Sequence, residues 1–425
     1  MKSSPIGRFG GAAGRVLALA GTVALVASAC GSSHHAATTT STTAGSTGTI
    51  GSAGTVAPGT QGTGTPYTVG VISSDSGAAG TTADISTTVH NWVTYTNSHG
   101  GINGHPVKLV YFDDQDSSAN AAADASTLIQ DHVLAVMDSS FVNNAFEKAV
   151  DAAKIPVISL TGSGQSFLYL TDANFFADST TVLATVYAQP YTAKLAGATS
   201  IAYLYCAEDP NCAQAVPLAK ADAKSLGVNL NYSAAISSAA PNYTAQCLAA
   251  KAAGSQAMFI AAASPAAIAR VAANCASQGY NPIQVTASGT IADSFLTQPG
   301  FGQVIGEVNT FPVFLNSSPA TQVFHQVMDS YLPKALRPVT VSAAWTGMEL
   351  FKAAAVNAGD SPTAQSIYTG LYGVNGTLGG LAPTLSFKQG QPNPVNCFYE
   401  VKSQGGKYTA PNGDTPTCVT PPPIG

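Results

Sequence analysis

The sequence predicts an α/β protein with two successive sets of parallel strands. Short runs rich in β-branched residues alternate with helical patterns of apolar residues, beginning with a strand over 67–72 and a helix over 81–97. A second set of the same kind begins with a strand over 201–205. Strands that alternate with helices of about 10–15 residues are typical of βαβ units, which form parallel sheets. We therefore expect two open α/β sheets in one chain.

The expected elements follow in chain order. The first set has strands over 67–72, 107–112, 133–137 and 155–160 and helices over 81–97, 119–131 and 143–153. The second set has strands over 201–205, 228–232, 257–261 and 283–286 and helices over 213–226, 244–253 and 265–278. A later apolar helix is expected over 341–358, and a strand pair from residue 385 includes the segment 397–401. Trp92 and Trp345 lie on apolar helix faces and are expected in the core.

The N-terminus is typical of an export signal. Lys2, Arg8 and Arg15 precede an apolar run over 16–26, which is too short to cross a bilayer. The run leads to small residues and then to Cys30, a pattern that resembles a bacterial lipoprotein signal over residues 1–29, although Ala27 stands where such signals usually carry a leucine-like residue. That resemblance implies cleavage before Cys30 and a lipid on its sulfur. The alternative is an ordinary secretory peptide, and either way the mature protein works outside the cytoplasm.

Residues 30–66 form the next segment and consist almost entirely of Ser, Thr, Gly and Ala after Cys30. Such a composition cannot bury a core, so we expect a flexible tether. His34 and His35 lie in it and are expected to be solvated.

Composition excludes several classes of protein. Of 425 residues, 9% are charged and 45% are hydrophobic, with a formal net charge of −5. No block of Lys and Arg follows the signal, so a nucleic-acid partner is not expected. No metal or other cofactor is predicted. Asp113, Asp114 and Asp116 lack the glycine and glutamate of a calcium loop, and Asp113 and Asp114 point to opposite faces of an extended segment, so we interpret them as loop and capping residues.

Six cysteines remain after Cys30, an even number that suggests disulfides in an oxidising compartment. Sequence neighbours suggest three pairs, although other pairings are possible in principle. The suggested pairs are Cys206–Cys212, Cys247–Cys275 and Cys397–Cys418. The alternative, a zinc cluster, lacks the usual Cys-x-x-Cys spacing.

The strand pattern also locates a candidate site. Ligands of open α/β sheets bind beyond the carboxyl ends of the strands. The loops expected there follow residues 72, 137, 160, 205, 261 and 286.

One run of residues resembles the signature of a particular protein family. The segment from Asn97 to Val110, which contains Gly100-Gly101-Ile102-Asn103-Gly104, resembles a signature of the substrate-binding proteins of branched-chain amino-acid ABC transporters. The resemblance continues at 111–115, 155–159, 379–383 and 385–387, and it covers roughly residues 67–402.

The resemblance implies a type I periplasmic-binding-protein fold. Two Rossmann-like lobes would be joined by a three-segment hinge and would close over a small ligand. Lobe 1 would comprise 67–185 plus 311–377, and lobe 2 would comprise 186–310 plus 378–425. It also implies a non-enzymatic, monomeric protein, lipid-anchored to the outer face of the bacterial cytoplasmic membrane, that delivers its ligand to an ABC permease. The alternative within this fold is a ligand-sensing receptor, and a secreted hydrolase is disfavoured because no nucleophile or metalloprotease motif is present.

Family members hold the ligand carboxylate with hydroxyls and backbone N–H groups of lobe 1. The corresponding positions are Ser139, Ser140, Thr161, Gly162 and Ser163. Hydroxyl residues and a glycine ahead of a helix also expose donors on physical grounds, although plain N-capping is the alternative.

Lobe 2 departs from the family pattern. Ser288 stands where an amino-acid receptor carries an acid for the ligand ammonium, and Ser264 stands near an expected aromatic position. Glu208 or Asp209, in the loop bounded by Cys206 and Cys212, could supply the missing charge. A neutral or purely anionic small ligand therefore fits as well as an amino acid.

Overall fold

The computed structural model describes residues 61–77, 83–261, 265–287, 291–331 and 340–422, which belong to one compact unit, residues 53–425. The expected signal and Cys30 lie outside the described residues, as does the tether up to residue 60. Among the described residues, no helix is long and apolar enough to span a membrane.

The last residues of the expected tether are not free, as the prediction had them. They form hydrogen bonds with the loop that carries the glycine signature. The Gly64 N–H donates to the Gly104 carbonyl at 3.0 Å, and His105 Nδ1 lies 2.8 Å from the Thr65 carbonyl oxygen. Gly101 makes the tight turn there with φ +70°, and a Cβ on it would lie 2.1 Å from the His105 carbonyl oxygen.

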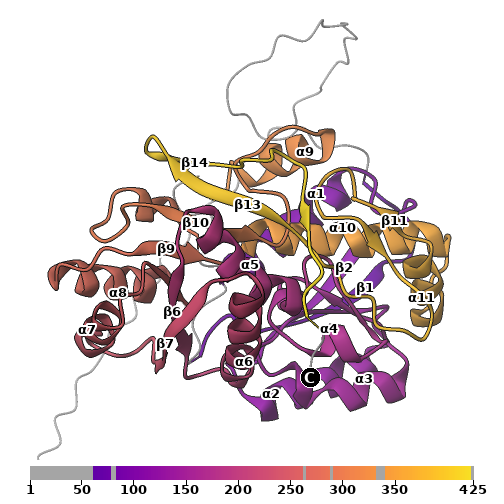
Figure 1. The fold of residues 1–425 in the computed structure, drawn as a ribbon. Coiled ribbons are helices and arrows are strands. Elements are labelled where there is room, and N and C mark those ends of the chain that lie inside the picture. Colours follow the sequence, from indigo (N-terminus) through magenta and orange to yellow (C-terminus); the bar gives the residue numbers. More distant parts are fainter. Residues whose placement is uncertain (1–60, 78–82, 262–264, 288–290, 332–339, 423–425) are drawn as a thin grey trace, which may run out of the picture. The chain divides into compact units, whose positions relative to one another are not determined.

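The first sheet has five strands, all parallel, in the order β2-β1-β3-β4-β5. Its strands β1 and β2 are labelled in Figure 1. The strands are β1 (Tyr67–Ser73), β2 (Val107–Asp113), β3 (Val136–Ser139), β4 (Val157–Ser159) and β5 (Phe175–Phe176). The helices of this region are α1 (Ala83–Ser98), α2 (Ser118–Gln130), α3 (Glu147–Ala153) and α4 (Leu168–Thr171), with short 3₁₀ turns at Asn143–Ala145 and Gly162–Gly164.

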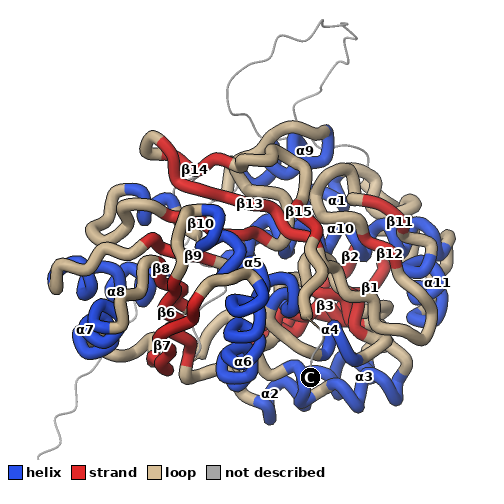
Figure 2. Tube along the Cα trace, in the orientation of Figure 1, coloured by secondary structure: helices blue, strands red, loops and turns tan. Residues whose placement is uncertain are grey.

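The second sheet has the order β14-β13-β10-β9-β8-β6-β7, with β15 beside β13 (Figure 2). Its parallel strands are β6 (Ser200–Cys206), β7 (Asn229–Ile236), β8 (Ala257–Ile260), β9 (Ile283–Thr286) and β10 (Val304–Val308). Its antiparallel edge is β13 (Cys397–Gln404), β14 (Lys407–Thr409) and β15 (Thr417–Cys418). The parallel first sheet, the parallel strands β6 to β10 of the second sheet and the C-terminal strand pair confirm the predicted fold class.

The remaining elements complete the chain. They are α5 (Val182–Leu195), α6 (Pro210–Ser225), α7 (Thr244–Ala252), α8 (Pro265–Ser277), α9 (Pro319–Met328), α10 (Thr340–Ala358), α11 (Ala364–Tyr372), a 3₁₀ turn at Asp293–Leu296, and the short pair β11 (Asn375–Gly376) and β12 (Leu385–Ser386).

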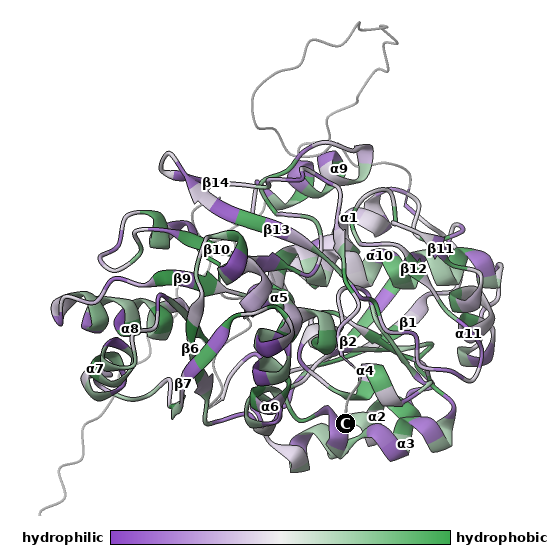
Figure 3. Cartoon of the chain, in the orientation of Figure 1, coloured by the Kyte–Doolittle hydropathy of each residue, from purple (hydrophilic) through white to green (hydrophobic). Residues whose placement is uncertain are grey.

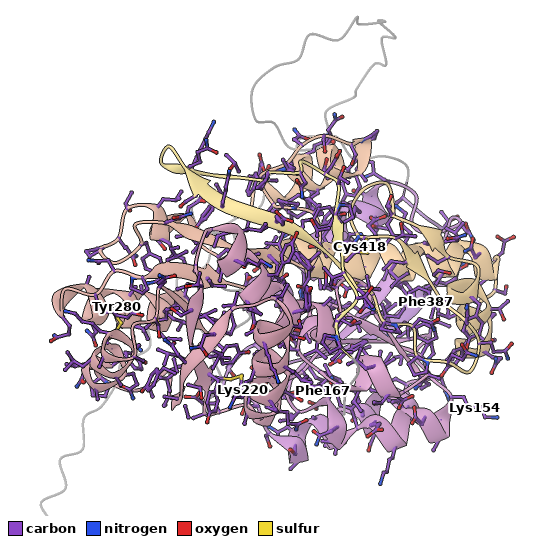
Figure 4. All side chains as sticks on the ribbon, in the orientation of Figure 1. Lys154, Phe167, Lys220, Tyr280, Phe387 and Cys418 are labelled. Carbon is purple, nitrogen blue, oxygen red and sulfur yellow. A yellow bond between two sulfur atoms is a disulfide. The ribbon has the colours of Figure 1, made fainter. Side chains whose placement is uncertain are left out.

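The largest hydrophobic core surrounds the first sheet. Trp92 and Trp345 are buried in it as predicted, and the Trp92 indole N–H donates to Glu349 Oε1 at 2.7 Å. Most of α10 is buried there as well, which agrees with its apolar colouring in Figure 3. Phe387, labelled in Figure 4, packs edge-on against Phe176 in the same core.

Residues near the expected lobe boundaries pack as follows. Leu381, Leu385 and Val395 pack with the first sheet although the sequence analysis assigned them to lobe 2, because the chain after residue 377 returns over the first core. Val182 packs with the second sheet although it was assigned to lobe 1.

Three segments connect the cores and are hydrogen-bonded to one another. The chain passes from one core to the other near 177–182, 308–311 and 395–399. Thr180 Oγ1 donates to the Cys397 carbonyl at 2.6 Å and to the Asn309 carbonyl at 3.1 Å, and the Thr181 N–H donates to the Val395 carbonyl at 2.9 Å. One threonine therefore links all three connections.

All three suggested disulfides are present: Cys206–Cys212, Cys247–Cys275 and Cys397–Cys418. Cys418, labelled in Figure 4, lies on β15 opposite Cys397 of β13.

Candidate functional site

The candidate site lies at the carboxyl edge of the first sheet. Because β1 to β4 are parallel, the residues that follow each strand meet at one edge. Ser74, Asp114 and Ser140 follow β1, β2 and β3, and all three are buried. Thr161, just beyond β4, is partly exposed.

The structure brings the two predicted hydroxyl loops together. Ser139 Oγ and Thr161 Oγ1 lie 2.8 Å apart, and Asp138 pairs with Ser159 in the register of β3 and β4. The predicted residues Ser139, Ser140, Thr161 and Ser163 therefore belong to one continuous polar region. Gly162 begins the 3₁₀ turn that carries Ser163.

Ser140 is bound to the interior. Its hydroxyl donates to Asp114 Oδ2 in a short hydrogen bond, and its oxygen accepts the Val142 N–H at 3.1 Å. Asp114 is itself fully buried and also accepts Ser74 Oγ–H at 2.7 Å and the Asp116 N–H at 2.9 Å. Asp114 is therefore an anchor of the site loops, which agrees with its predicted role as a loop residue.

Ser163 has a similar environment. It is fully buried and its Oγ lies 2.9 Å from Asp178 Oδ1 and 2.7 Å from Ser179 Oγ. Its N–H donates to Ser159 Oγ at 3.0 Å. The sequence analysis did not single out Asp178.

A third buried carboxylate lies between these two. Asp138 accepts the Ser140 N–H at 2.9 Å, Asn143 Nδ2–H at 2.8 Å and the Tyr169 hydroxyl at 2.7 Å. Burial raises the pKa of Asp138 to about 6 against the opposing effect of these donors. Burial likewise raises the pKa of Asp178 to about 6.

The exposed end of the cluster behaves differently. Burial acts to raise the pKa of Asp113, but hydrogen bonds from the Ser76 hydroxyl and from nearby backbone N–H groups outweigh it and hold the pKa below its ordinary value. Asp113 ends β2 and accepts hydrogen bonds from the loop after β1. The N-cap of α2 is Ser117, so the helix-capping role predicted for Asp113 is wrong.

The structure describes only some of the site residues predicted for the second lobe. Glu208 accepts Ser237 Oγ–H at 2.7 Å and the Ser238 N–H at 2.8 Å, so it joins the loops after β6 and β7. Ser264 and Ser288 lie outside the described residues. Asp209 caps α6 by accepting the Asn211 N–H at 2.8 Å.

The site loop rests against a connecting segment. A Cβ on Gly164 would lie 2.0 Å from Asn309 Nδ2, so a larger residue there would have to displace the Asn309 side chain. Asn309 belongs to the same connection whose carbonyl accepts Thr180 Oγ1–H. The turn that carries Ser163 is thus packed directly on the link between the two cores.

A separate cavity of about 130 Å³ lies beside the second sheet. Its lining includes Val308, Phe314, His325, Val401 and Tyr408. None of the predicted hydroxyl residues contributes to it.

These features agree with a family match over most of the chain. Residues 66–407 match the model of the periplasmic binding protein family, so the chain belongs to that family. Its members are substrate-binding proteins, and an extracytoplasmic location follows from the family. No protein of curated function matches the chain.

Solved structures show the same fold at low sequence identity. A branched-chain amino acid ABC transporter protein from Thermus thermophilus with bound valine has a TM-score of 0.72 and 15% identity, covering 83% of this chain and 97% of its own. A leucine binding protein from Thermotoga maritima has a TM-score of 0.67 and 14% identity, covering 81% and 97%. An ABC transporter solute binding protein from R. palustris in complex with 4-hydroxybenzoate has a TM-score of 0.65 and 17% identity, covering 81% and 95%. The named ligands differ widely, so the fold alone does not define the ligand.

Proposed function

We propose that the chain is a lipid-anchored solute-binding protein that captures a small polar ligand and delivers it to an ABC permease. The observation that carries this proposal is the polar edge of the first sheet, where Ser139 and Thr161 share a hydrogen bond beside the connection between the cores. Loops at this edge are where open α/β sheets bind ligands.

The proposed mechanism is lobe closure without covalent chemistry. The first lobe contains the first core, and the second contains the second sheet with its antiparallel edge. The three connections, held together at Thr180, form the hinge. Closing the lobes removes a bound solute from water and strengthens its polar contacts with the site loops.

The proposed location depends on the N-terminus. Cleavage before Cys30 and lipidation of its sulfur would leave the folded part attached to the outer face of the membrane by the segment up to residue 60. The protein would work as a monomer, since one copy carries both proposed lobes.

A thermal-shift screen of residues 31–425 against amino acids, amides, amines, short carboxylates and polyols tests solute binding. A ligand at 100 times its dissociation constant adds about 2.7 kcal/mol to the free energy of unfolding. We expect at least one class to raise the melting temperature. A flat result across all the classes would contradict the proposed function.

A further inference from the structure

The cavity beside the second sheet has walls from both hydrophobic cores. Val308, Val401 and Tyr408 belong to the core of the second sheet, whereas Val313 packs against the core of the first. The chain between Val308 and Val313 is one of the three connections, so the cavity lies against a link between the cores. A molecule that fills it would contact residues of both.

The volume of the cavity sets the size of an occupant. It is about 130 Å³, and an apolar cavity of about 150 Å³ holds one benzene-sized molecule. Phe314 lines the cavity and is 38% exposed, so a small molecule can enter beside this ring. A single six-membered ring with one short substituent therefore fits this space.

The polar side chains of the lining are already engaged in hydrogen bonds. The Tyr408 hydroxyl donates to the Ala292 carbonyl at 3.0 Å. His325 Nδ1 lies 3.1 Å from Asp329 Oδ1, and His325 Nε2 lies 3.0 Å from the Leu315 carbonyl oxygen. A phenolic oxygen that donates one hydrogen bond can still accept another. The lining thus offers an occupant apolar surface and one acceptor, the hydroxyl oxygen of Tyr408.

The charges of the lining disfavour an ionised occupant. Among the described residues that line the cavity there is no Lys or Arg, and both ring nitrogens of His325 are engaged, so an anion would have no counter-ion. The carboxylate of Asp293 is exposed, and its attraction for a cation is screened by solvent. Removing an ammonium group from water costs several kcal/mol, which a screened carboxylate does not offset. A neutral molecule avoids both costs.

We propose that this cavity is a second binding site, for a small neutral ring compound that carries one hydroxyl group. Its ring would pack against Val308, Val401 and Phe314, and its hydroxyl would donate to the Tyr408 oxygen. This inference goes beyond the proposed function, because the solute proposed above is a polar molecule held at the edge of the first sheet.

A matched series separates the charge classes. Residues 31–425 are titrated by calorimetry at neutral pH with benzyl alcohol, benzylamine and benzoate, which share one aromatic ring and differ in charge. We expect benzyl alcohol to bind saturably, one molecule per chain, and at least about tenfold more tightly than either charged compound. If benzyl alcohol shows no saturable binding, or if benzylamine or benzoate binds as tightly, the inference is overturned. The thermal-shift screen for the polar solute is independent of this result.

Variants of the cavity wall locate the bound ring. Ala292→Leu places a larger apolar side chain in the space of the ring, and we expect at least about tenfold weaker binding of benzyl alcohol. Val313→Phe fills the cavity from the wall that belongs to the first core, and it serves with the same expected loss if Ala292→Leu does not fold.

The control is Ala269→Leu. Like Ala292, Ala269 is partly buried and packs against the core of the second sheet, but it does not line the cavity. We expect this variant to bind benzyl alcohol as wild type does. Wild-type binding in a folded wall variant, or an equal loss in the control, would contradict the placement of the site.

Discussion

Ser139 and Thr161 lie 22 residues apart in the chain, and their hydroxyl oxygens are 2.8 Å apart at the carboxyl edge of the first sheet. Parallel pairing of β3 and β4 causes this meeting, since it brings the ends of both strands to the same edge. The two hydroxyls share one hydrogen bond, so one of their two protons stays available, and we propose this pair as a contact for a solute.

The first prediction removes this pair. Ser139→Ala combined with Thr161→Val eliminates both hydroxyls, and we expect the solute with the largest thermal shift to bind about tenfold more weakly, because each lost hydrogen bond costs about 0.5–1.5 kcal/mol. Calorimetric titration measures the change. The control is Ser126→Ala on the exposed face of α2, where the hydroxyl bonds only to its own helix. Wild-type affinity in the double variant would show that the site lies elsewhere.

The second prediction concerns Gly164. Gly164→Ala places a Cβ about 2 Å from Asn309 Nδ2, and we expect a loss of about 1–3 kcal/mol in the free energy of unfolding, as in other overpacked interiors. Urea unfolding measures it. Gly302→Ala is the control, since a Cβ there meets nothing within 4 Å. Equal stability of the two variants would mean that the turn does not press on the connecting segment.

The third prediction compares two disulfides. Cys247→Ala with Cys275→Ala opens a loop with a sequence separation of 28, whereas Cys206→Ala with Cys212→Ala opens one with a separation of 6. The first pair is also fully buried. We expect the first double variant to lose about 2–4 kcal/mol and the second to lose less, because the longer loop and the buried sulfurs both add to the cost. Guanidinium unfolding of both variants decides the order, and a larger loss at Cys206–Cys212 would contradict it.

The fourth prediction uses the pH dependence of Asp222. Burial raises the pKa of Asp222 to about 7, so the folded state holds this proton more tightly than the unfolded chain does. Its contribution to stability is therefore fully present below the ordinary pKa of 3.8 and is lost as the pH rises through about 7. Asp222→Asn removes this dependence.

The measurement is the stability difference between Asp222→Asn and wild type at several pH values. We expect the variant to gain on the order of 2 kcal/mol over wild type between pH 4 and pH 8, since part of the effect is screened by solvent. A difference that stays constant with pH would show that Asp222 does not titrate in this range.

The sequence predicted most of the fold because its strands and helices carry clear periodicity. It missed α5, whose small and apolar residues are buried on all sides and give no amphipathic pattern, and which contains Pro190. It also missed β10, where Gly306 and the buried Glu307 interrupt the apolar run. In these elements tertiary burial overrides the local signal.

The sequence predicted where the candidate site lies, but it did not predict the buried carboxylates around it. Chain order alone puts Ser139 and Thr161 beyond neighbouring strands. The buried carboxylates of Asp138 and Asp178 gave no such signal, because their burial depends on donors such as Tyr169 and Ser163 that reach them only in the folded state. Asp178, for example, accepts the hydroxyl proton of Ser163 in the candidate site.

A crystal structure of residues 31–425 with the solute that gives the largest thermal shift tests the central claim most directly. The account predicts a polar group of that solute about 3 Å from the hydroxyl oxygen of Ser139, Ser140 or Thr161. A solute bound instead in the cavity lined by Phe314 and Tyr408, with the hydroxyl edge filled by water, would contradict it.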